Sequence, residues 1–597
     1  MLKRNNIFFL VVTLLLLSNG NAYAQQRKTT QKKTKTTNTK NNKKATTKKT
    51  TATVTTNTPT TTSNKETVKK DSTVAKVNAD TSKPDVVVIY AAFKPSLRNA
   101  AKLNFTAATP VIDTVKFSLN YNVPAQNLFF SYQPVPLKPL ALFVDSNFTW
   151  TNNQYIKAGF GGYSTPYVET GLSFGDGKKK LTSIYGMFTS SKGKLPFQQF
   201  SKAVLNMAGN YAINDNHELS GKIYFHNNTQ YLYGYQPDTL VFNKKDLKQQ
   251  FNSVGVQASY TRKLPNAYGL TYSPSLHLNY FFDARKTGEF NIEAKVPVRK
   301  TFNEKLSLDV SLTADITAYK DTAKTINNNL FYLNTSARYR LNDNILLNIG
   351  LQPAFDNSEI NLLPNITVEA KLTDKRFIIQ AGWIGYYNKN NYRSLATYNP
   401  YLAIPAFMAN TKVNEIFGGF KGSAGSHFTY NATVSFTSMI NQPLFTNDLV
   451  DGKTFIMINE PDLQAIKFHG EVGYSIQEKF SLLAGATIYQ FTKSTNDRPF
   501  GILPMEITGT LKWQILKDLH LKADLFIWDG TKYIAKNLST EKLRGAVDMN
   551  IGAEYSIMPK LNLWLQFNNL LNNKYQRWNQ YEVLGLNVIG GVVYSFR

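Results

Sequence analysis

Charged side chains recur at even spacing within several segments, and this pattern is the clearest sign of possible chemistry in the chain. Because the side chains of a strand switch face at each residue, charges at even spacing share one face. A face of this kind could line a water-filled passage and act on charged solutes. Eight residues occupy the polar side of clear alternations and are the candidate pore-lining residues: Asp309, Asp315, Arg338, Arg340, Lys522, Asp524, Asp548 and Glu554.

The other reactive residue types form no recognisable catalytic or metal-binding pattern. The chain has six histidines, and no two of them stand at i, i+2 on one strand face. It has no cysteine, which excludes thiol chemistry, disulfides and cysteine-based metal sites. No local signature separates a Ser/His/acid site from the many scattered serines and aspartates. We therefore expect no catalytic residue, no metal and no cofactor, and predict that the protein is not an enzyme.

The elements that position these charges are predicted to be strands with one apolar and one polar face. Residues 306–318 alternate without a break between Leu, Val, Ile or Ala and Ser, Thr or Asp, and residues 519–528 and 547–557 repeat the pattern. The chain is 42% hydrophobic and 13% aromatic, yet it lacks a long apolar run after its first residues. This combination is typical of a transmembrane β-barrel, whose strands need only about 9–11 residues each.

The first 24 residues read as a secretory signal peptide. Lys3 and Arg4 precede an apolar stretch over residues 7–17, and Ala22 and Ala24 form a small-x-small cleavage site. The apolar stretch is shorter than the roughly 20 residues that a spanning helix needs. We therefore predict a cleaved signal and a mature protein that leaves the cytoplasm.

Residues 25–83 are predicted to be a disordered periplasmic tail rich in Lys, Thr and Asn. The segment from Gln26 to Lys83 carries 15 Lys or Arg against three acids, within a chain of net charge +28. Such a composition buries too little apolar surface to fold. Two interpretations remain open: attachment to an anionic partner such as a cell-wall glycan or lipid head groups, and a solvated spacer. We do not expect nucleic acid as a partner, because the tail has no interleaved aromatic residues and is exported.

Residues 84–153 are irregular and contain several prolines, whereas residues 154–597 carry the alternating segments. Two kinds of connection separate these segments. Ten short polar turns are predicted near residues 176–177, 214–216, 265–266, 303–304, 342–344, 373–375, 422–426, 477–478, 517–518 and 558–560. Longer connections cover residues 388–412, 441–464, 492–504 and 531–544. Ten turns with both termini on one rim imply about 22 antiparallel strands.

The last strand has the form of a barrel insertion signal. Its apolar face carries Val588, Val592, Tyr594 and Phe596, and the chain ends one residue after the final aromatic. Outer-membrane barrels resemble one another in ending with such a strand. We therefore expect the barrel insertion machinery and outer-membrane lipid as partners.

The C-terminal region resembles the barrel portion of the TonB-dependent receptor family. The motifs that carry the resemblance are the segment 568–575 (NNLLNNKY), Trp578, Tyr581 and the closing segment 590–596 (GGVVYSF). The resemblance implies a 22-strand barrel in the outer membrane of a Gram-negative bacterium. Family members carry an N-terminal plug of well over a hundred residues and a box for the energy-transducing partner, and neither is recognisable here.

A barrel of this size without a plug would leak unless its lumen were closed in another way. Three solutions are open: residues 84–153 act as a reduced plug, extracellular loops fold inward, or a plug-supplying protein partner fills the lumen. We expect passage or uptake of solutes across the outer membrane. The alternative is a structural or assembly anchor that links the membrane to an acidic periplasmic partner or the cell wall through the basic tail.

Aromatic residues of the barrel region give two further expectations. Residues near strand ends are predicted to form an interfacial girdle: Trp383, Tyr386, Tyr387, Tyr489, Trp528 and Trp564. Loop aromatics could instead stack on sugars: Tyr392, Tyr398, Tyr401 and Phe407.

Overall fold

The structure, a computed structural model, describes residues 154–596 except 177, 373–375, 478 and 497. The predicted signal peptide with Ala22 and Ala24, the basic tail of residues 25–83 and the segment 84–153 lie outside the described residues. Within the described part of the chain, no helix is both long enough and apolar enough to cross a membrane.

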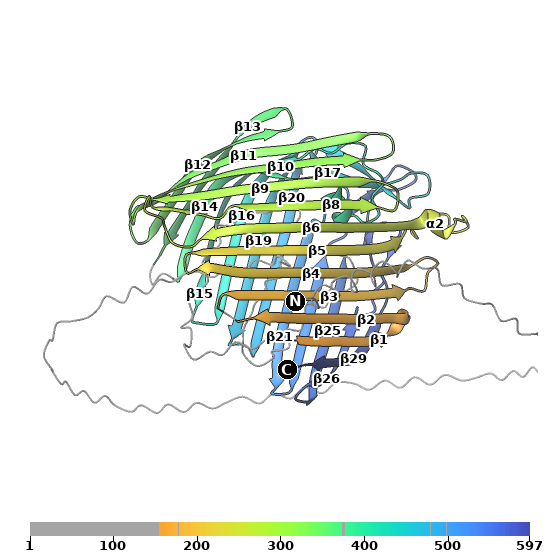
Figure 1. Cartoon of the computed structure of the whole chain (residues 1–597). Coiled ribbons are helices and arrows are strands. Elements are labelled where there is room, and N and C mark those ends of the chain that lie inside the picture. Colours follow the sequence, from red (N-terminus) through yellow and green to blue (C-terminus); the bar gives the residue numbers. More distant parts are fainter. Residues whose placement is uncertain (1–153, 177, 373–375, 478, 497, 597) are drawn as a thin grey trace, which may run out of the picture. The chain divides into compact units, whose positions relative to one another are not determined.

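One antiparallel sheet closes on itself to form a barrel (Figure 1). The first strand, β1 (Gln154–Gly161), pairs with the last, β29 (Asn587–Ser595), from Tyr155↔Ser595 to Gly161↔Ile589. The sheet contains 23 strands. Because β7 (Leu270–Tyr272) and β8 (Ser275–Asp283) pair with successive parts of β9 (Gly288–Thr301), they share one position, which leaves 22 positions around the barrel. The predicted fold is confirmed.

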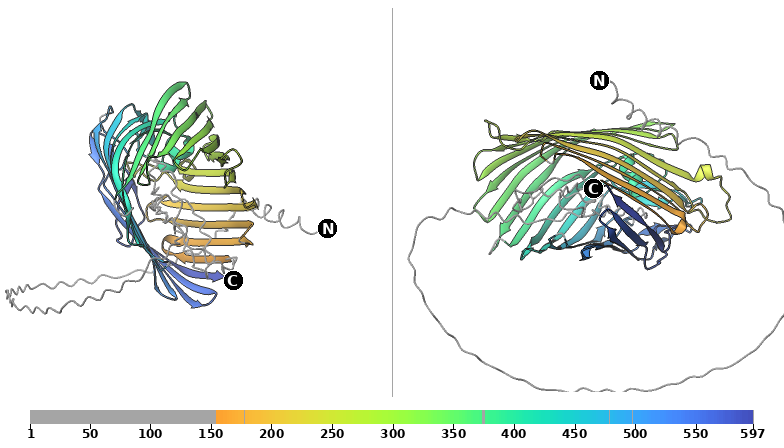
Figure 2. Two further views of the ribbon diagram at one scale, coloured as in Figure 1. Left: turned by 90° about the vertical axis from the view of Figure 1, so that its left-hand side faces the viewer. Right: turned by 60° about the horizontal axis from the view of Figure 1, so that its bottom comes forward.

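The remaining wall strands follow in chain order around the barrel (Figure 2). They are β2 (Thr165–Gly175), β3 (Lys180–Lys192), β4 (Gln199–Asn214), β5 (His217–Tyr231), β6 (Lys248–Arg262), β10 (Leu306–Lys320), β11 (Thr325–Arg340), β12 (Ile345–Asp356), β13 (Glu359–Lys371), β14 (Phe377–Asn388), β15 (Thr411–Ala424), β16 (Phe428–Ile440), β19 (Leu463–Ile476), β20 (Phe480–Lys493), β21 (Met505–Leu516), β22 (Leu519–Trp528), β25 (Ala546–Met558) and β26 (Leu561–Asn568).

The alternation in sequence becomes an alternation in exposure. In β10, Leu312 and Ile316 are 54% and 41% exposed, whereas Thr313 and Thr317 are 1% and 0% exposed. The apolar face therefore points away from the barrel, as lipid requires, and the polar face points into the lumen.

Where the predicted turns lie within the described residues, they join strands at one rim, and side chains cap the backbone in several of them. The turn at residues 373–375 and residues 177 and 478 of two other turns lie outside the described part. The carboxylate of Asp176 accepts bonds from the backbone N–H groups of Lys178, Lys179 and Lys180 at 2.7–2.9 Å. These bonds, led by that of Lys180, lower the pKa of Asp176 to about 2. The amide oxygens of Asn303 and Asn342 accept from the second and third following N–H groups in the same way. Asn and Asp thus stabilise tight reversals as the sequence predicted.

Connections at the other rim differ more in length than the sequence suggested. The four long loops predicted there are present, and two more cover residues 232–247, with α2 (Lys244–Leu247), and residues 569–586. In contrast, β1 and β2 are joined by the short η2 (Gly162–Ser164), β10 and β11 by residues 321–324, and β12 and β13 by residues 357–358. The long loops carry α3 (Tyr392–Tyr398) and three two-stranded sheets: β17 (Gln442–Asn447) with β18 (Phe455–Glu460), β23 (Lys532–Ile534) with β24 (Thr540–Lys542), and β27 (Gln576–Trp578) with β28 (Tyr581–Glu582).

Candidate functional site

Three long loops pack together at the mouth of the barrel, and we call them the loop cap: residues 389–410, 441–462 and 569–586. Their buried side chains form one cluster with lumen-facing residues of the wall. The loops contribute Tyr392, Leu395, Ala396, Tyr398, Leu402, Met408, Phe445, Phe455, Met457, Trp578 and Tyr581, and the wall contributes Phe251, Phe281 and Tyr319. A hydrophobic core of this kind holds the loops inward rather than in solvent.

The loop of residues 389–410 reaches far across the mouth. It leaves the wall between β14 and β15, yet the carbonyl oxygen of Pro400 accepts bonds from Gln230 on β5 at 2.6 Å and Gln249 on β6 at 2.8 Å. Strands β5 and β6 lie about eight positions away in a barrel of 22. The loop therefore covers a large part of the opening.

Side chains of the loop and of the wall cap the first turn of the helix α3 in this loop. Asn391 and Ser394 form a capping box at the start of α3. The carboxylate of Glu289, on β9, accepts the backbone N–H groups of Tyr392 at 2.5 Å and Arg393 at 3.2 Å. The wall thus provides partners for N–H groups that the helix itself leaves unpaired.

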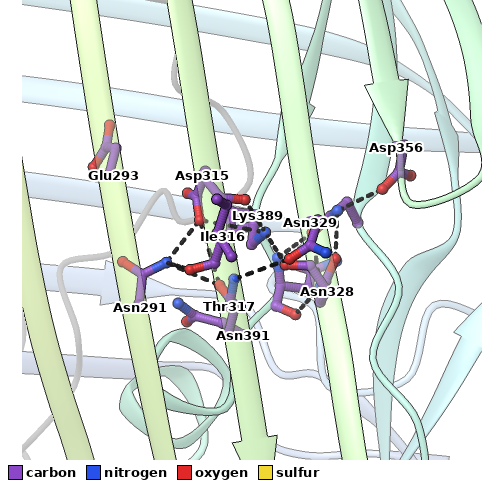
Figure 3. A network of polar contacts seen from close by, with 12 residues as sticks. Asn291, Glu293, Asp315, Ile316, Thr317, Asn328, Asn329, Asp356, Lys389 and Asn391 are labelled. Carbon is purple, nitrogen blue, oxygen red and sulfur yellow. Dashed lines mark hydrogen bonds and ion pairs between the residues drawn. The ribbon is translucent and has the colours of Figure 1, made fainter.

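A polar network fixes the first residues of the loop to strands β10 and β11 (Figure 3). The Lys389 ammonium lies 3.3 Å from the Asp315 carboxylate and donates to the backbone oxygen of Asn328 at 2.5 Å. At the end of the loop, Asn410 donates to Asp356 at 2.6 Å and to Asn328 at 2.7 Å. Both ends of the loop are therefore bonded to the same stretch of wall.

A buried guanidinium joins two loops of the cap. Arg577 donates to the Tyr398 hydroxyl at 2.9 Å and to the carbonyl oxygen of Gly501 at 3.1 Å, and its charge lies 4.3 Å from the centre of the Trp578 ring. Arg577 is only 6% exposed, so these contacts are made out of water and hold residues 569–586 against α3.

Three of the loop aromatics, Tyr392, Tyr398 and Tyr401, pack into the cap, which corrects the expectation that they could stack on sugars. Tyr392 and Tyr398 are 0% and 6% exposed, and Tyr401 stacks on Tyr581 with ring centres 3.4 Å apart. Burial raises the pKa of Tyr398 and Tyr401 above the ordinary tyrosine value. Among the four, Phe407 alone is exposed, at 43%.

Four of the predicted pore-lining residues lie on β10 and β11. Asp309 pairs with Arg299 at 2.5 Å and with Arg338 at 3.6 Å. Asp315 pairs with Lys389, as described above. Arg340 ends β11 beside the short turn, is exposed, and forms no ion pair with a described residue.

The other four predicted residues lie on β22 and β25. Lys522 pairs with Asp524 at 2.9 Å. Glu554 accepts from Asn562 at 2.8 Å and lies 3.9 Å from the Lys157 ammonium, and Asp548 accepts from the Tyr575 hydroxyl. Apart from Arg340, the eight residues therefore make separate local contacts along the wall rather than forming one cluster.

Only part of the predicted aromatic girdle faces outward. Trp383 is 46% exposed, whereas Tyr489, Trp528 and Trp564 are 3–8% exposed and pack in clusters on the lumen side. The prediction is wrong for these three, because it rested on their position near strand ends, whereas each shares its strand face with polar residues that point into the lumen. The Trp564 ring contacts the seam of the barrel, where a Cβ at Gly159 would come within 2.4 Å of it.

The predicted insertion signal lies on the outward face of β29. Val592, Tyr594 and Phe596 are 40–46% exposed, and Val588 shares their face with intermediate exposure. The role of this strand in insertion stays a prediction.

Sequence reasoning missed Lys389, Arg393, Arg577 and Glu289. Three of them lie in loops, where no periodicity assigns a face, although the run 388–391 (NKNN) was a local sign of an unusually polar loop. The described residues include no group of three or more His, Asp or Glu side chains that could hold a metal ion.

Comparison with known proteins identifies the fold. No protein-family model and no curated protein matches the sequence. Among solved structures, the barrel is similar to the FrpB iron transporter of Neisseria meningitidis, with TM-score 0.58 and 12% identity over 74% of this chain and 82% of that chain. The ferripyoverdine receptor of the outer membrane of Pseudomonas aeruginosa gives TM-score 0.56 and 10% identity over 74% and 72%. The ferric enterobactin receptor PfeA of the same species gives 0.56 and 11% over 74% and 81%.

Proposed function

We propose that the protein admits a solute across the outer membrane through its lumen, with the loop cap as the gate. The similar structures are receptors and a transporter of bacterial outer membranes, and at 10–12% identity they establish the fold alone. The observation that carries the proposal is the inward packing of the cap against the wall residues Phe251, Phe281 and Tyr319. A barrel of 22 strands that closes its mouth with its own loops has the parts of a gated passage.

The rim of short turns faces the periplasm in this proposal, and the loop cap faces the outside. Outer-membrane barrels have short periplasmic turns and longer external loops. Residue 154 and residue 595 both lie on the short-turn rim, so the residues that precede β1 start on the periplasmic side.

Replacing the central cap loop tests the proposal. Asn388 and Thr411 are register partners, so a short Gly/Ser linker can replace residues 390–409 without disturbing β14 and β15. We expect the mature protein to conduct little in a planar lipid bilayer. The loop-replaced variant should conduct at least about tenfold more, because a lumen of this width is otherwise aqueous.

A matched control replaces another loop of the same rim. Residues 530–544 join β22 and β25 and contribute nothing to the cluster that forms the cap core. The same linker there should leave conductance near the level of the unaltered protein. If both variants are inserted but remain closed, gating by the cap is wrong. The anchor alternative, which rests on residues 25–83 outside the described part, would then become the leading hypothesis.

A further inference from the structure

A cavity of about 390 Å³ lies between four loops of the long-loop rim. Asn447 and Asn579 line it from two loops of the cap, Gln236 lines it from residues 232–247, and Tyr533 lines it from residues 530–544. None of these four residues belongs to the cluster that forms the cap core. The volume lies at the lower end of the range for small-molecule sites, about 300–1,000 Å³.

Hydrogen bonds between the loops give the cavity a fixed shape. The backbone N–H of Gln236 donates to the carbonyl oxygen of Asp451 at 2.8 Å. The Lys536 ammonium donates to the carbonyl oxygen of Gln236, also at 2.8 Å. These bonds join residues 232–247 to two of the neighbouring loops. A ligand that enters such a preformed site has little of the protein left to order, which favours binding.

The lining of the cavity offers amide groups that are not used within the protein. The side chains of Gln236 and Asn579 have no hydrogen-bond partner among the described residues, and neither is fully buried. Asn447 is 4% exposed and donates to the carbonyl oxygen of Gly452 at 2.9 Å, but its amide oxygen has no partner in the described part of the chain. A buried polar atom of this kind requires an explanation. Each amide can both donate and accept, as the hydroxyl groups of a ligand do.

The remaining side chains of the lining point to an uncharged ligand with an apolar face. Lys536 and Asp448 are the charged residues of the lining, so its formal charges cancel. An anionic ligand would need an excess of cations, which this cavity lacks. Tyr533 is half-buried, and its hydroxyl donates to Glu541 at 2.6 Å, which holds the side chain in place. An aromatic ring presents a flat apolar surface against which the C–H face of a sugar ring can pack.

We propose that this cavity binds a neutral saccharide, with Gln236 and Asn579 bonded to its hydroxyl groups and Tyr533 packed against its ring. The inference rests on the proposed function in that the saccharide would be the solute that the passage admits. Two of the loops that line the cavity, residues 441–462 and 569–586, belong to the loop cap. The bound saccharide would therefore contact the gate from the outside before it enters the lumen.

An array of immobilised neutral and charged glycans tests the site with the full-length mature protein. An amine-oxide detergent is required, because a detergent with a sugar head group would compete. We expect retention on neutral glycans, weakened about tenfold or more by Tyr533→Ala, because an aromatic anchor carries much of the binding energy of a small site. Asn579→Leu should also weaken retention, whereas Tyr533→Phe keeps the ring and should preserve most of it.

The matched control is Tyr268→Ala, which removes a tyrosine that is 74% exposed on the rim of short turns. It should leave retention unchanged. Failure to retain any glycan, preference for charged glycans, or retention that does not respond to Tyr533→Ala would overturn the site.

The conductance of the loop-replaced variant tests the passage separately, because this variant keeps every residue named for the site. Glycan binding that depends on Tyr533, in a protein whose loop-replaced variant stays closed, would support the site and contradict the passage. A loop-replaced variant that conducts, in a protein that retains no glycan, would contradict the site and leave the passage intact. The two proposals can therefore fail independently.

Discussion

Buried polar side chains at a few positions decide how firmly the cap is held. Lys389 makes an ion pair and two backbone bonds within a mostly buried network, and Asp315 also accepts from Asn291 at 2.7 Å. Removing one member of such a pair leaves the other charge uncompensated in a site poor in water. The hydrophobic cluster of the cap stabilises the loop without specifying its position, whereas the polar contacts of Lys389 fix the first residue of the loop to the wall.

Substituting Lys389→Met should therefore loosen the loop of residues 389–410. We expect protection of the α3 amides against hydrogen exchange to fall roughly 30-fold, equivalent to about 2 kcal/mol. The double variant Asp315→Asn with Lys389→Met removes both charges and should recover part of the protection. Equal protection in the single variant and the unaltered protein would show that the ion pair does not hold the loop.

Glu460 gives the cap a predictable response to acid. Burial alone would raise its pKa, but bonds from the backbone N–H groups of Asn496 at 2.8 Å and Thr495 at 2.6 Å, and from the Ser494 hydroxyl, hold it below the ordinary value of 4.5. A carboxylate with a lowered pKa stabilises the folded state above its ordinary pKa, and this contribution is lost as pH falls through the lowered value.

We therefore expect the contact between residues 441–462 and 494–504 to weaken below about pH 4.5. Hydrogen exchange at Thr495 and Asn496, corrected for intrinsic rates, measures it directly. In Glu460→Gln the protection should be lower at neutral pH and flat across the acid range. A flat profile in the unaltered protein would contradict the assignment.

At the scale of elements, the wall and the cap differ in how far local sequence specifies them. The strands and the turns within the described residues were predictable because two-residue alternation and Asn or Asp turn chemistry act over a few residues. The cap was not, because its contacts join distant positions: Gln230 with Pro400 are 170 residues apart, and Arg577 with Tyr398 are 179 apart. The wrong faces for Trp528 and Trp564 have a different cause, because both share a strand face with polar residues and only their position near strand ends suggested the lipid face.

Cross-linking two cap loops tests whether they must separate for passage. Leu402 and Phe455 are paired in an isolated bridge, and Ala403 donates to the Phe455 carbonyl at 2.8 Å. Such a pairing brings two Cα atoms within the range of a disulfide. The chain has no cysteine, so Leu402→Cys with Phe455→Cys adds one defined pair.

We expect the oxidised double variant to show fewer voltage-driven openings in a bilayer than the same sample after reduction. Each single cysteine variant controls for the lost packing and should not respond to the reductant. If oxidation leaves the openings unchanged, the loops of residues 389–410 and 441–462 move together or not at all.

At the scale of the whole molecule, the fold raises the question of how a wide barrel stays closed. The described residues give one answer, a cap built from three loops and supported by the wall. Residues 84–153, the candidate reduced plug, lie outside the described part, so their contribution remains a prediction. The two answers differ in which segment has to be removed to open the lumen.

Deleting residues 25–153 while keeping the signal peptide separates these answers. If the cap alone closes the mouth, conductance should stay near the baseline of the full chain, and only the further replacement of residues 390–409 should open the lumen. A large conductance after the first deletion would place the gate in the N-terminal segment, because the cap would then be present and insufficient. The heat-dependent mobility of each variant on a gel shows whether it is folded, because a folded β-barrel resists unfolding by detergent until it is heated. A folded variant that gives no conductance then has a blocked lumen.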